Sequence, residues 1–243
     1  MRIIRQVNPG PAAARNYAAR EAKGELLAFI DDDCEAHANW LERLLETNRQ
    51  HPQALVGGSS RNAVHDNIFC VTNHLILDLV YDHSNPGPHN AGFLASNNWL
   101  CQRDLFFQIG GFDESFRQAG GEDRDFCSRW QAAHYQIVWQ KDAIAEHWHH
   151  QNFASFLKMH LRYDRGAYSF HTSSVQSDRL ETKSTVRFYM HTLPSLIRHM
   201  QDIPSWWKRK QLVGLLFIWQ IVNVLGFIQQ ATISRSEKFR TSV

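Results

Sequence analysis

The chain has 243 residues, 43% of them hydrophobic and 21% charged, which suits a folded globular protein with a sizeable core and excludes a disordered chain. Its 26 basic and 24 acidic residues leave a net charge of +2, so the composition gives no reason to expect nucleic acid as a partner. Its four cysteines have no paired spacing, which argues against a zinc site and predicts free thiols in the reducing cytoplasm.

The N-terminal part is predicted to contain a short strand, a turn, a helix and a second strand. Met1–Gln6 has the pattern of a strand whose two arginines leave no apolar run for a signal peptide, and Asn8–Pro11 is a turn. Ala12–Lys23 is rich in alanine and predicts a helix, with Gly24 placed for a left-handed C-cap. Five apolar residues, Leu26–Ile30, then predict a strand that is buried on both faces.

Three consecutive carboxylates, those of Asp31, Asp32 and Asp33, follow this strand. They repel one another at close range unless a cation lies among them. Ligands of open α/β sheets bind at the carboxyl ends of strands, and Mg²⁺ or Mn²⁺ prefers oxygen ligands and commonly bridges to phosphates. The triplet therefore indicates a site for a metal and a diphosphate, although a solvated acidic turn explains the three residues equally well.

The middle of the chain carries further strand and helix signals. Asn39 is placed to open a helix, and Glu122 and Asp123 stand in the first turn of another. The predicted strands and turns are, in order, the strand Ala54–Val56, the turn Gly57–Ser60, the turn-rich loop His83–Asn90, and the strands Gln136–Trp139 and Ala143–His147. Taken alone, the acidic pair needs no catalytic role, because acids in a first turn complement the helix dipole.

Residues 171–243 differ in composition from the rest of the chain. Ser173–Lys183 is polar and predicts a loop, and Thr185–Met200 has the apolar spacing of a helix. The aromatic and basic cluster Trp206–Lys210 precedes Gln211–Ser234, a stretch without a charged residue. This stretch could span a bilayer, lie in its surface or pack as an ordinary helix, and the cluster at its head favours association with a membrane surface.

The order of these motifs resembles the central segment of family 2 glycosyltransferases of the GT-A fold. Members typically read N-x-G-x-x-x-A-R-N, A-x-G-E, an apolar strand, D-x-D and W-L, and this chain has NPGPAAARN, AKGE, LLAFI, DDD and NWL in that order. Gly110–Glu114 and Gly121–Phe126 are similar to the family's G-G-F-D-E block and to the acidic pair that follows it. Ala143–His147 resembles the family's strand that ends in histidine. The resemblance covers most of residues 6–170.

This resemblance implies an α/β fold, with a GT-A-like (Rossmann-like) mixed sheet flanked by helices in residues 1–170 and a helical C-terminal extension in residues 171–243. It implies a transferase that moves a sugar from a nucleoside-diphosphate-sugar donor to an acceptor hydroxyl with inversion. The acceptor would be a glycan or a lipid-linked molecule of polysaccharide, glycolipid or cell-surface glycan synthesis. The cofactor would be Mg²⁺ or Mn²⁺, and the enzyme would lie at the cytoplasmic face of the membrane.

The resemblance also implies metal-binding and catalytic roles. Asp31, Asp33 and His147 would hold the metal, with Asp33 making the main contact, because a metal can neutralise the leaving diphosphate. Asp123 would be the general base that takes the proton of the acceptor hydroxyl, and Glu122 would position it or raise its basicity.

The remaining site residues are assigned to the donor nucleotide, which would contact Arg15, Asn16, Asp31 and Asp32. Arg162 and Arg165, on a predicted helix, fit either a diphosphate or surface ion pairs. His147 could instead be a ring packed at a strand end, in a chain with fourteen histidines.

The chain departs from the family pattern in where it starts. Members usually begin with two further strands that hold the base and the ribose, and Met1–Gln6 looks like the strand that follows them. We therefore expect a GT-A-like domain truncated at its N-terminus, with an inactive, membrane-docked scaffold as the alternative. A metal-dependent nucleotidyltransferase would need a glycine-rich basic loop, which the sequence lacks. His134 stands where the family often has a glycine turn.

Overall fold

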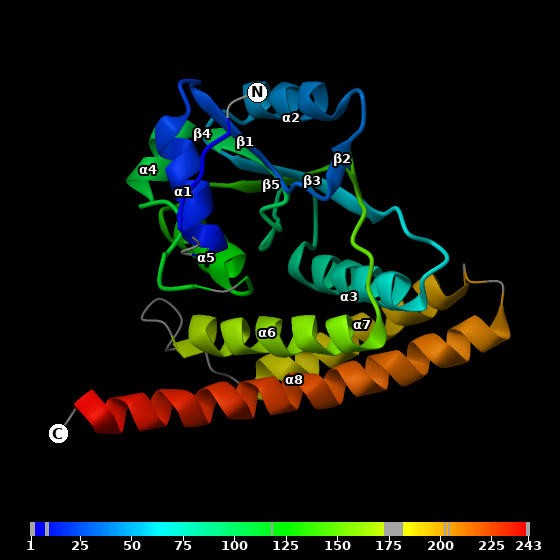
Figure 1. The fold of residues 1–243 in the computed structure, drawn as a ribbon. Coiled ribbons are helices and arrows are strands. Elements are labelled where there is room, and N and C mark those ends of the chain that lie inside the picture. Colours follow the sequence, from blue (N-terminus) through cyan, green and yellow to red (C-terminus); the bar gives the residue numbers. More distant parts are fainter. Residues whose placement is uncertain are drawn as a thin grey trace.

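The structure, a computed structural model, describes residues 3–7, 10–117, 119–172, 182–201, 203 and 205–241. Its centre is a five-stranded sheet with the strand order β1-β4-β3-β5-β2 (Figure 1). The strands are β1 (Leu26–Ile30), β2 (Cys34–Ala36), β3 (Leu55–Asn62), β4 (Asn98–Gln102) and β5 (Ile137–His147). β3 and β5 run parallel, and the other neighbouring strands run antiparallel. The predicted α/β fold with a mixed sheet is confirmed.

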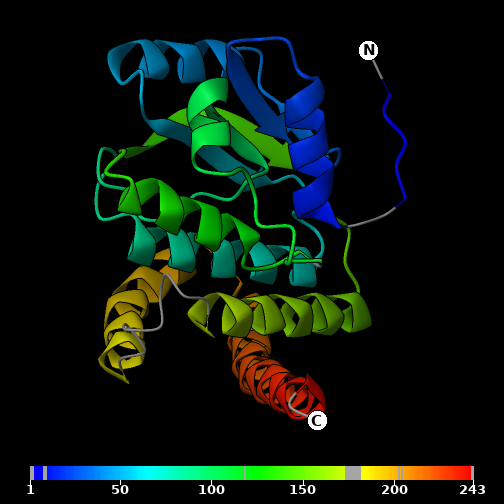
Figure 2. The same cartoon turned by 90° about the vertical axis from the view of Figure 1, so that its left-hand side faces the viewer.

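Helices cover both faces of the sheet (Figures 1 and 2). On one face, Trp40 and Leu44 of α2 (Trp40–Gln50) pack against Val56 and Leu100. The other face meets α1 (Pro11–Glu21), α4 (Arg103–Gln108) and α5 (Glu122–Ala132). This second core is built on aromatic side chains, namely Trp99, Phe106, Phe112, Phe126 and Trp130.

A further layer of helices lies on the far side of α3 (Ile68–Ser84) and consists of α6 (Phe153–Thr172), α7 (Thr182–Gln201) and α8 (Trp206–Thr241) (Figure 1). α3 contributes to two cores. Its Tyr81 belongs to the aromatic core beside the sheet, whereas Leu75 and Leu79 pack with Phe156 of α6 and Trp219 of α8. The C-terminal helices are therefore packed onto the sheet domain through α3.

The first strand matches its predicted bounds but not its predicted burial. β1 lies at the edge of the sheet, and Ala28 and Ile30 are exposed, so the strand is not buried on both faces. An apolar run suggests full burial, but burial depends on what lies beside the strand. The strand predicted at Met1–Gln6 is also wrong for its described part, because residues 3–7 have no regular secondary structure.

The first helix is shorter than predicted at its C-terminal end. The helix expected over Ala12–Lys23 ends at Glu21, because Ala22 is already extended, with φ −70° and ψ 141°. Gly24 is therefore not a left-handed cap. The prediction that Asn39 precedes a helix is confirmed, since Asn39 is the N-cap residue of α2.

The turn predicted at Gly57–Ser60 is wrong, because β3 continues through it. A Cβ at Gly58 would overlap the carbonyl oxygen of Ala143 on β5 and would lie 2.6 Å from the side-chain amide of Asn98. Glycine pairs are typical of turns, but this glycine is needed where three strands approach one another closely.

The two strands predicted at Gln136–Trp139 and Ala143–His147 form one continuous strand, β5. The register between β3 and β5 shifts between Gly57 and Ser59, opposite the residues that were expected to separate the two strands. His134, in the turn before β5, has φ 64°, a left-handed conformation that favours glycine. This agrees with the glycine that the family often has there.

The C-terminal helices follow the sequence pattern. α7 contains the predicted helix Thr185–Met200, and α8 extends beyond the uncharged stretch Gln211–Ser234 at both ends. Of the predicted loop Ser173–Lys183, residues 173–181 lie outside the described residues, and the remaining two residues belong to α7.

Candidate active site

Strand pairing brings the acidic triplet to the end of β5. The triplet connects β1 to β2, and β2 pairs antiparallel with β5 so that Cys34 lies opposite His147. The backbone N–H of Trp148 donates a 2.8 Å hydrogen bond to the carbonyl oxygen of Asp33. The side chains of Asp33 and His147 are therefore held at the same edge of the sheet, although they are far apart in the sequence.

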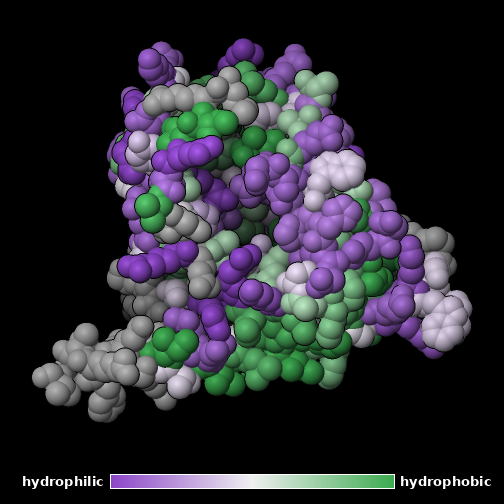
Figure 3. All heavy atoms as spheres, in the orientation of Figure 1, coloured by the Kyte–Doolittle hydropathy of each residue, from purple (hydrophilic) through white to green (hydrophobic). Residues whose placement is uncertain are grey.

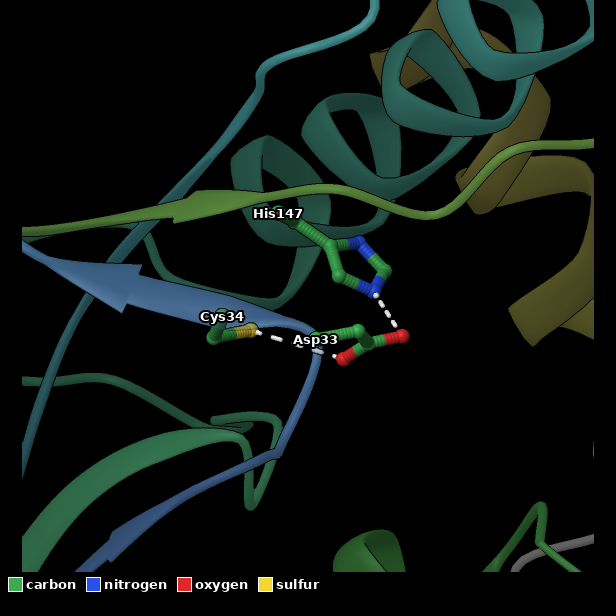
Figure 4. Close-up of side chains that lie close together, drawn as sticks. All are labelled: Asp33, Cys34 and His147. Atoms are coloured by element: carbon green, nitrogen blue, oxygen red, sulfur yellow. Dashed lines mark hydrogen bonds and ion pairs between the residues drawn. The ribbon is translucent and has the colours of Figure 1, made fainter.

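Asp33 is the centre of a group of potential metal ligands (Figure 4). Its Oδ2 lies 3.2 Å from Nε2 of His147 and 3.3 Å from Nδ1 of His149, and the two imidazole rings stack with centroids 5.4 Å apart. The ligand atoms of Asp33, Cys34 and His147 all lie within 4.8 Å of one another. The structure thus brings together two of the three residues that the sequence assigns to the metal, Asp33 and His147.

The chemistry of this group fits a divalent cation. A carboxylate and imidazoles suit Mn²⁺ well, and Mg²⁺ accepts the carboxylate but is a poorer match for imidazole. Cys34 is the poorer match for either ion, because Mn²⁺ and Mg²⁺ prefer oxygen ligands to the soft sulfur of a thiol. Asp33, His147 and His149 are therefore the residues of this group that could hold Mn²⁺.

Arg15 joins the end of β1 to the start of α5. Its Nη2 lies 2.9 Å from Oδ1 of Asp31 and its Nη1 lies 3.4 Å from Oε1 of Glu122. Burial alone would lower the pKa of Arg15, but the carboxylates of Asp123, Asp31 and Glu122 outweigh it and raise this pKa. The guanidinium therefore stays charged, and it holds Asp31 in a group apart from Asp33 and His147.

The two groups adjoin. The charge of Asp31 acts on both the Cys34 thiol and the Asp123 carboxyl, since it raises the pKa of each. Asp32, which lies between Asp31 and Asp33 in the sequence, is exposed in the turn that connects β1 to β2. Figure 3 shows that hydrophilic side chains surround a hollow on this face, between the sheet and the C-terminal helices.

Glu122 and Asp123 are the first two residues of α5, which lies below the sheet in Figure 1, and Arg15 joins them to the acidic triplet through its contacts with Asp31 and Glu122. Oε2 of Glu122 accepts a 2.6 Å hydrogen bond from the N–H of Gly120, and Oδ2 of Asp123 accepts one of 3.2 Å from the N–H of Ser96. Burial, followed by the charge of Asp123, raises the pKa of Glu122 to about 7. Burial also raises the pKa of Asp123.

The second carboxylate oxygen of Asp123, Oδ1, is buried and has no hydrogen-bond partner among the described residues. Buried polar atoms of proteins are almost always paired, so an unpaired carboxylate oxygen is suited to accept a hydrogen bond, and then a proton, from another molecule.

Asn16 has a different environment from the one predicted. Its Nδ2 donates to the carbonyl oxygen of Phe112 (2.8 Å) and to Oε1 of Glu114 (3.0 Å), and its Oδ1 accepts from the N–H of Phe112 (2.9 Å). Both donors of the amide are used, so in this structure Asn16 orients the loop that contains Phe112 and Glu114. Its assignment to the donor nucleotide stays a prediction without a contact to support it.

Two residues of the site were not assigned from the sequence: His149 and Cys34. Cys34 is brought to His147 by the pairing of β2 with β5, and His149 lies two residues beyond the end of that pairing. Alternate residues of an extended segment face one side, so the spacing of His147 and His149 was the signal that could have identified the second histidine.

The raised pKa of Glu122 predicts a pH-dependent stability. The folded-state pKa of about 7 lies above the ordinary value of 4.5, so the folded state favours the protonated carboxyl and loses stability as the pH rises from about 4.5 to 7. We expect the free energy of unfolding to fall by about 2–3 kcal/mol over this range because of Glu122 alone.

The variant Glu122→Gln tests this prediction, because glutamine keeps an oxygen for the Gly120 N–H but cannot titrate. In this variant, the free energies of unfolding from urea titrations at pH 5 and 7.5 should no longer differ by this amount. The control Glu42→Gln, at an exposed position, should keep the difference; equal slopes in all three proteins would contradict the assignment.

Comparison with known families and proteins finds similarity to glycosyltransferases. Residues 1–110 match the family described as "Glycosyl transferase family 2", and residues 77–151 match the family described as "N-terminal domain of galactosyltransferase". The chain is 30% identical over 149 residues to the pre-mycofactocin glycosyltransferase of Mycobacterium tuberculosis, an alignment that covers 58% of this chain and 30% of the relative. It is 27% identical over 169 residues to glycosyltransferase AglE of Haloferax volcanii, covering 68% of this chain and 52% of the relative.

A third relative is the succinoglycan biosynthesis protein ExoM of Rhizobium meliloti, 32% identical over 136 residues, which are 54% of this chain and 42% of the relative. The chain thus spans about a third to a half of the length of these curated relatives. Among solved structures, it is similar to mannosyltransferase PcManGT from Pyrobaculum calidifontis in complex with GDP-Man and Mn²⁺. That match has a TM-score of 0.54 and 13% identity and covers 92% of this chain and 66% of the other, so it shows a shared fold.

Proposed function

Because residues 1–110 of the chain match the model of glycosyl transferase family 2, we propose that the protein moves a sugar from a nucleoside-diphosphate-sugar donor to an acceptor hydroxyl with inversion at the anomeric carbon. The observation that carries this proposal is the convergence of two groups at one edge of the sheet. One group, around Asp33 and His147, can hold a cation. The other contains Asp123, a carboxylate with an unpaired oxygen.

Asp33, His147 and His149 would hold the divalent cation on the donor side. When bound, Mn²⁺ or Mg²⁺ would supply positive charge to the diphosphate of the donor. Arg15 adds a fixed positive charge between Asp31 and Glu122 and so keeps the two acidic groups in place without mutual repulsion. The neighbour from Pyrobaculum calidifontis was solved with GDP-Man and Mn²⁺, which supports this choice of donor and cation.

Asp123 would act on the acceptor side as the general base. In a single displacement, the acceptor oxygen forms a bond to the anomeric carbon, the bond from that carbon to the diphosphate breaks, and the hydroxyl proton passes to Asp123. Attack from the face opposite the leaving group inverts the anomeric centre. Glu122, whose pKa burial raises to about 7, is about half protonated at neutral pH and so adds less negative charge around this base than a fully ionised carboxylate would.

The acceptor is proposed to be a glycan or a lipid-linked molecule of polysaccharide or glycolipid synthesis. The names of two relatives support this class, the succinoglycan biosynthesis protein ExoM and the glucosyl-dolichyl phosphate glucuronosyltransferase of Haloferax volcanii, which is 24% identical over 152 residues. The sugar and the nucleotide base of the donor can be identified by screening nucleoside-diphosphate sugars.

Calorimetric titration of UDP and GDP into the wild-type chain, with and without Mn²⁺, tests the proposal. We expect binding of one of the two nucleotides that depends on Mn²⁺ and is lost in Asp33→Ala. The same nucleotide should then be released from its sugar conjugate when acceptors are supplied. A folded chain that binds neither nucleotide would contradict the proposed donor and would support the alternative of an inactive scaffold.

We also propose that α8 lies along the surface of a membrane. Its segment Trp206–Ile233 is the one described helix that is long and apolar enough to cross a membrane, and about a third of it is buried inside the protein. Leu212 and Trp219 face the protein core, whereas Val213 and Phe217 are 55% and 68% exposed. Figure 3 shows the resulting hydrophobic surface along the lower edge of the molecule.

A helix that is packed along one side and apolar on the other suits a position in the plane of the interface. Trp206 and Trp207 at its start are exposed, and the exposed cations Lys208, Arg209 and Lys210 follow them directly. Tryptophans and cations are the residues that anchor a helix at an anionic lipid surface. The enzyme would then meet a lipid-linked acceptor at the cytoplasmic face.

Removing the three cations should weaken membrane binding. Each Lys or Arg near an anionic surface contributes about 1 kcal/mol, so the triple variant Lys208→Gln, Arg209→Gln, Lys210→Gln should bind vesicles with 30% phosphatidylserine about 100-fold more weakly. Co-sedimentation with vesicles measures this. A triple variant at exposed cations of the sheet domain, Lys23→Gln, Arg49→Gln, Arg61→Gln, has the same charge change and should bind as wild type. Equal loss in both variants, or in neither, would contradict docking through α8.

A further inference from the structure

The backbone of α6 lies directly against the turn that precedes the acidic pair. A Cβ at Gly166 of α6 would overlap the carbonyl oxygen of Gly120, and a Cβ at Gly121 would lie 2.6 Å from the carbonyl oxygen of Gly166. Gly120 and Gly121 also have left-handed φ values of +122° and +97°. The contact between Gly166 and this turn is therefore made between backbone atoms, which leaves little room for α6 to shift without moving the turn.

This turn holds Glu122 and begins α5. The N–H of Gly120 donates the 2.6 Å hydrogen bond to Oε2 of Glu122, and Gly121 is the N-cap residue of α5. A displacement of Gly166 would consequently move the turn, the Glu122 carboxyl and, through the first turn of α5, Asp123.

The opposite side of α6 packs closely against α8, although less closely than Gly166 packs against the turn. A Cβ at Gly226 of α8 would lie 2.8 Å from Cβ of Asp164 and 3.1 Å from the carbonyl oxygen of Leu161, both on α6. Side chains reinforce the contact: Nε of Arg165 donates to Oε1 of Gln229 (3.2 Å), and the rings of Tyr168 and Phe227 meet edge to face with centroids 5.0 Å apart. Figures 1 and 2 show α6 between α5 and α8 from both directions.

We infer that α6 transmits the position of α8 to Glu122 and Asp123, with Gly226 and Gly166 as positioning residues. This deepens the proposed function, because it makes the geometry of the proposed catalytic base depend on a helix that contacts neither donor nor acceptor. It also connects the proposed membrane-binding helix with the acidic pair through one rigid element. The inference itself concerns the free protein and needs neither a membrane nor a substrate.

A matched pair of glycine substitutions on α8 tests the inference. Gly226→Ala adds a methyl group against α6, whereas Gly214→Ala adds the same methyl group on the same helix where no atom lies within 4 Å. Both changes favour the helical state of α8 itself. Amide hydrogen exchange should become about tenfold faster at residues 119–126 in Gly226→Ala, because the turn loses its support, and should stay at the wild-type rate in Gly214→Ala.

Amide exchange in β3 and β5 distinguishes this local effect from a general loss of stability. The exchange rates of these two strands should remain at wild-type values in both variants. If Gly226→Ala does not fold, Phe227→Ala provides a second perturbation, since it weakens the contact with Tyr168 without adding atoms. Unchanged exchange at residues 119–126 in a variant that alters exchange in α6 would overturn the inference, and so would equal acceleration throughout the sheet.

Failure of the proposed transferase activity leaves this result unaffected, because no substrate is used. Where the activity is present, Gly226→Ala should lower the turnover number while the affinity for the nucleotide stays at the wild-type value. If the turnover number and the affinity for the nucleotide fell equally, α6 would support the whole site and not the acidic pair alone.

Discussion

Asp123→Asn should lower the rate of sugar transfer by about 10²- to 10⁴-fold, the range expected for loss of a general base, with nucleotide binding unchanged. Asparagine has the shape of aspartate, and its amide oxygen can still accept the 3.2 Å hydrogen bond from the N–H of Ser96. Its amide nitrogen cannot take a proton from the acceptor. The geometry of the site is therefore kept while its proposed chemistry is removed.

The rate is measured as release of the nucleoside diphosphate in the presence of acceptor, and binding by calorimetry with Mn²⁺. Asp104→Asn, at an exposed position on α4, makes the same chemical change away from the site and should leave both quantities at wild-type values. Full transfer by Asp123→Asn would show that another group takes the proton, and loss of binding would show that Asp123 belongs to the donor side.

Asp33→Ala should abolish the Mn²⁺-dependent part of UDP or GDP binding. Oδ2 of Asp33 is shared by His147 and His149, and it is the oxygen of this group that a hard cation would prefer. Loss of outer-shell partners alone typically costs 10–100-fold in metal affinity, so loss of the carboxylate itself should weaken nucleotide binding by about 100-fold or more.

Control variants should distinguish loss of the cation from loss of the folded structure in this binding measurement. Glu42→Ala removes an exposed carboxylate from α2 and should retain Mn²⁺-dependent binding. Asp33→Ala should match the wild type measured in EDTA, because both lack the cation. If Asp33→Ala bound the nucleotide with wild-type affinity in Mn²⁺, the cation would have to lie elsewhere, and the convergence of Asp33 with the two histidines would have no part in donor binding.

The sequence located the acidic triplet correctly within the fold but did not predict how its carboxylates are arranged. The end of the apolar run at Ile30 was correctly located, so the triplet was placed at the end of a strand. The separation of Asp31 from Asp33 could not be predicted, because it depends on Arg15, a residue of another element that reaches Asp31 but not Asp33. Long-range pairs of this kind leave no local periodicity in the sequence.

Two of the errors in the fold arose because the surroundings of a segment outweighed its local pattern. Gly58 was assigned to a turn because glycine is common there, whereas the structure uses it to let β3 approach Ala143. Leu26–Ile30 was assigned full burial because it is apolar, whereas the sheet ends at this strand. His134 was placed correctly by analogy with a glycine position, and its left-handed φ of 64° shows why that position is special.

The position of α3 between two cores has a consequence for cooperativity. One side of this helix fills the aromatic core with Tyr81, and the other side packs with Phe156, Leu216 and Trp219 of the C-terminal helices. Removing the chain after residue 170 would take Leu216 and Trp219 away from this second side, whereas Phe156 of α6 would remain. The change in composition near residue 170 is thus not a boundary in the packing, and we expect the parts before and after it to unfold together in a single transition.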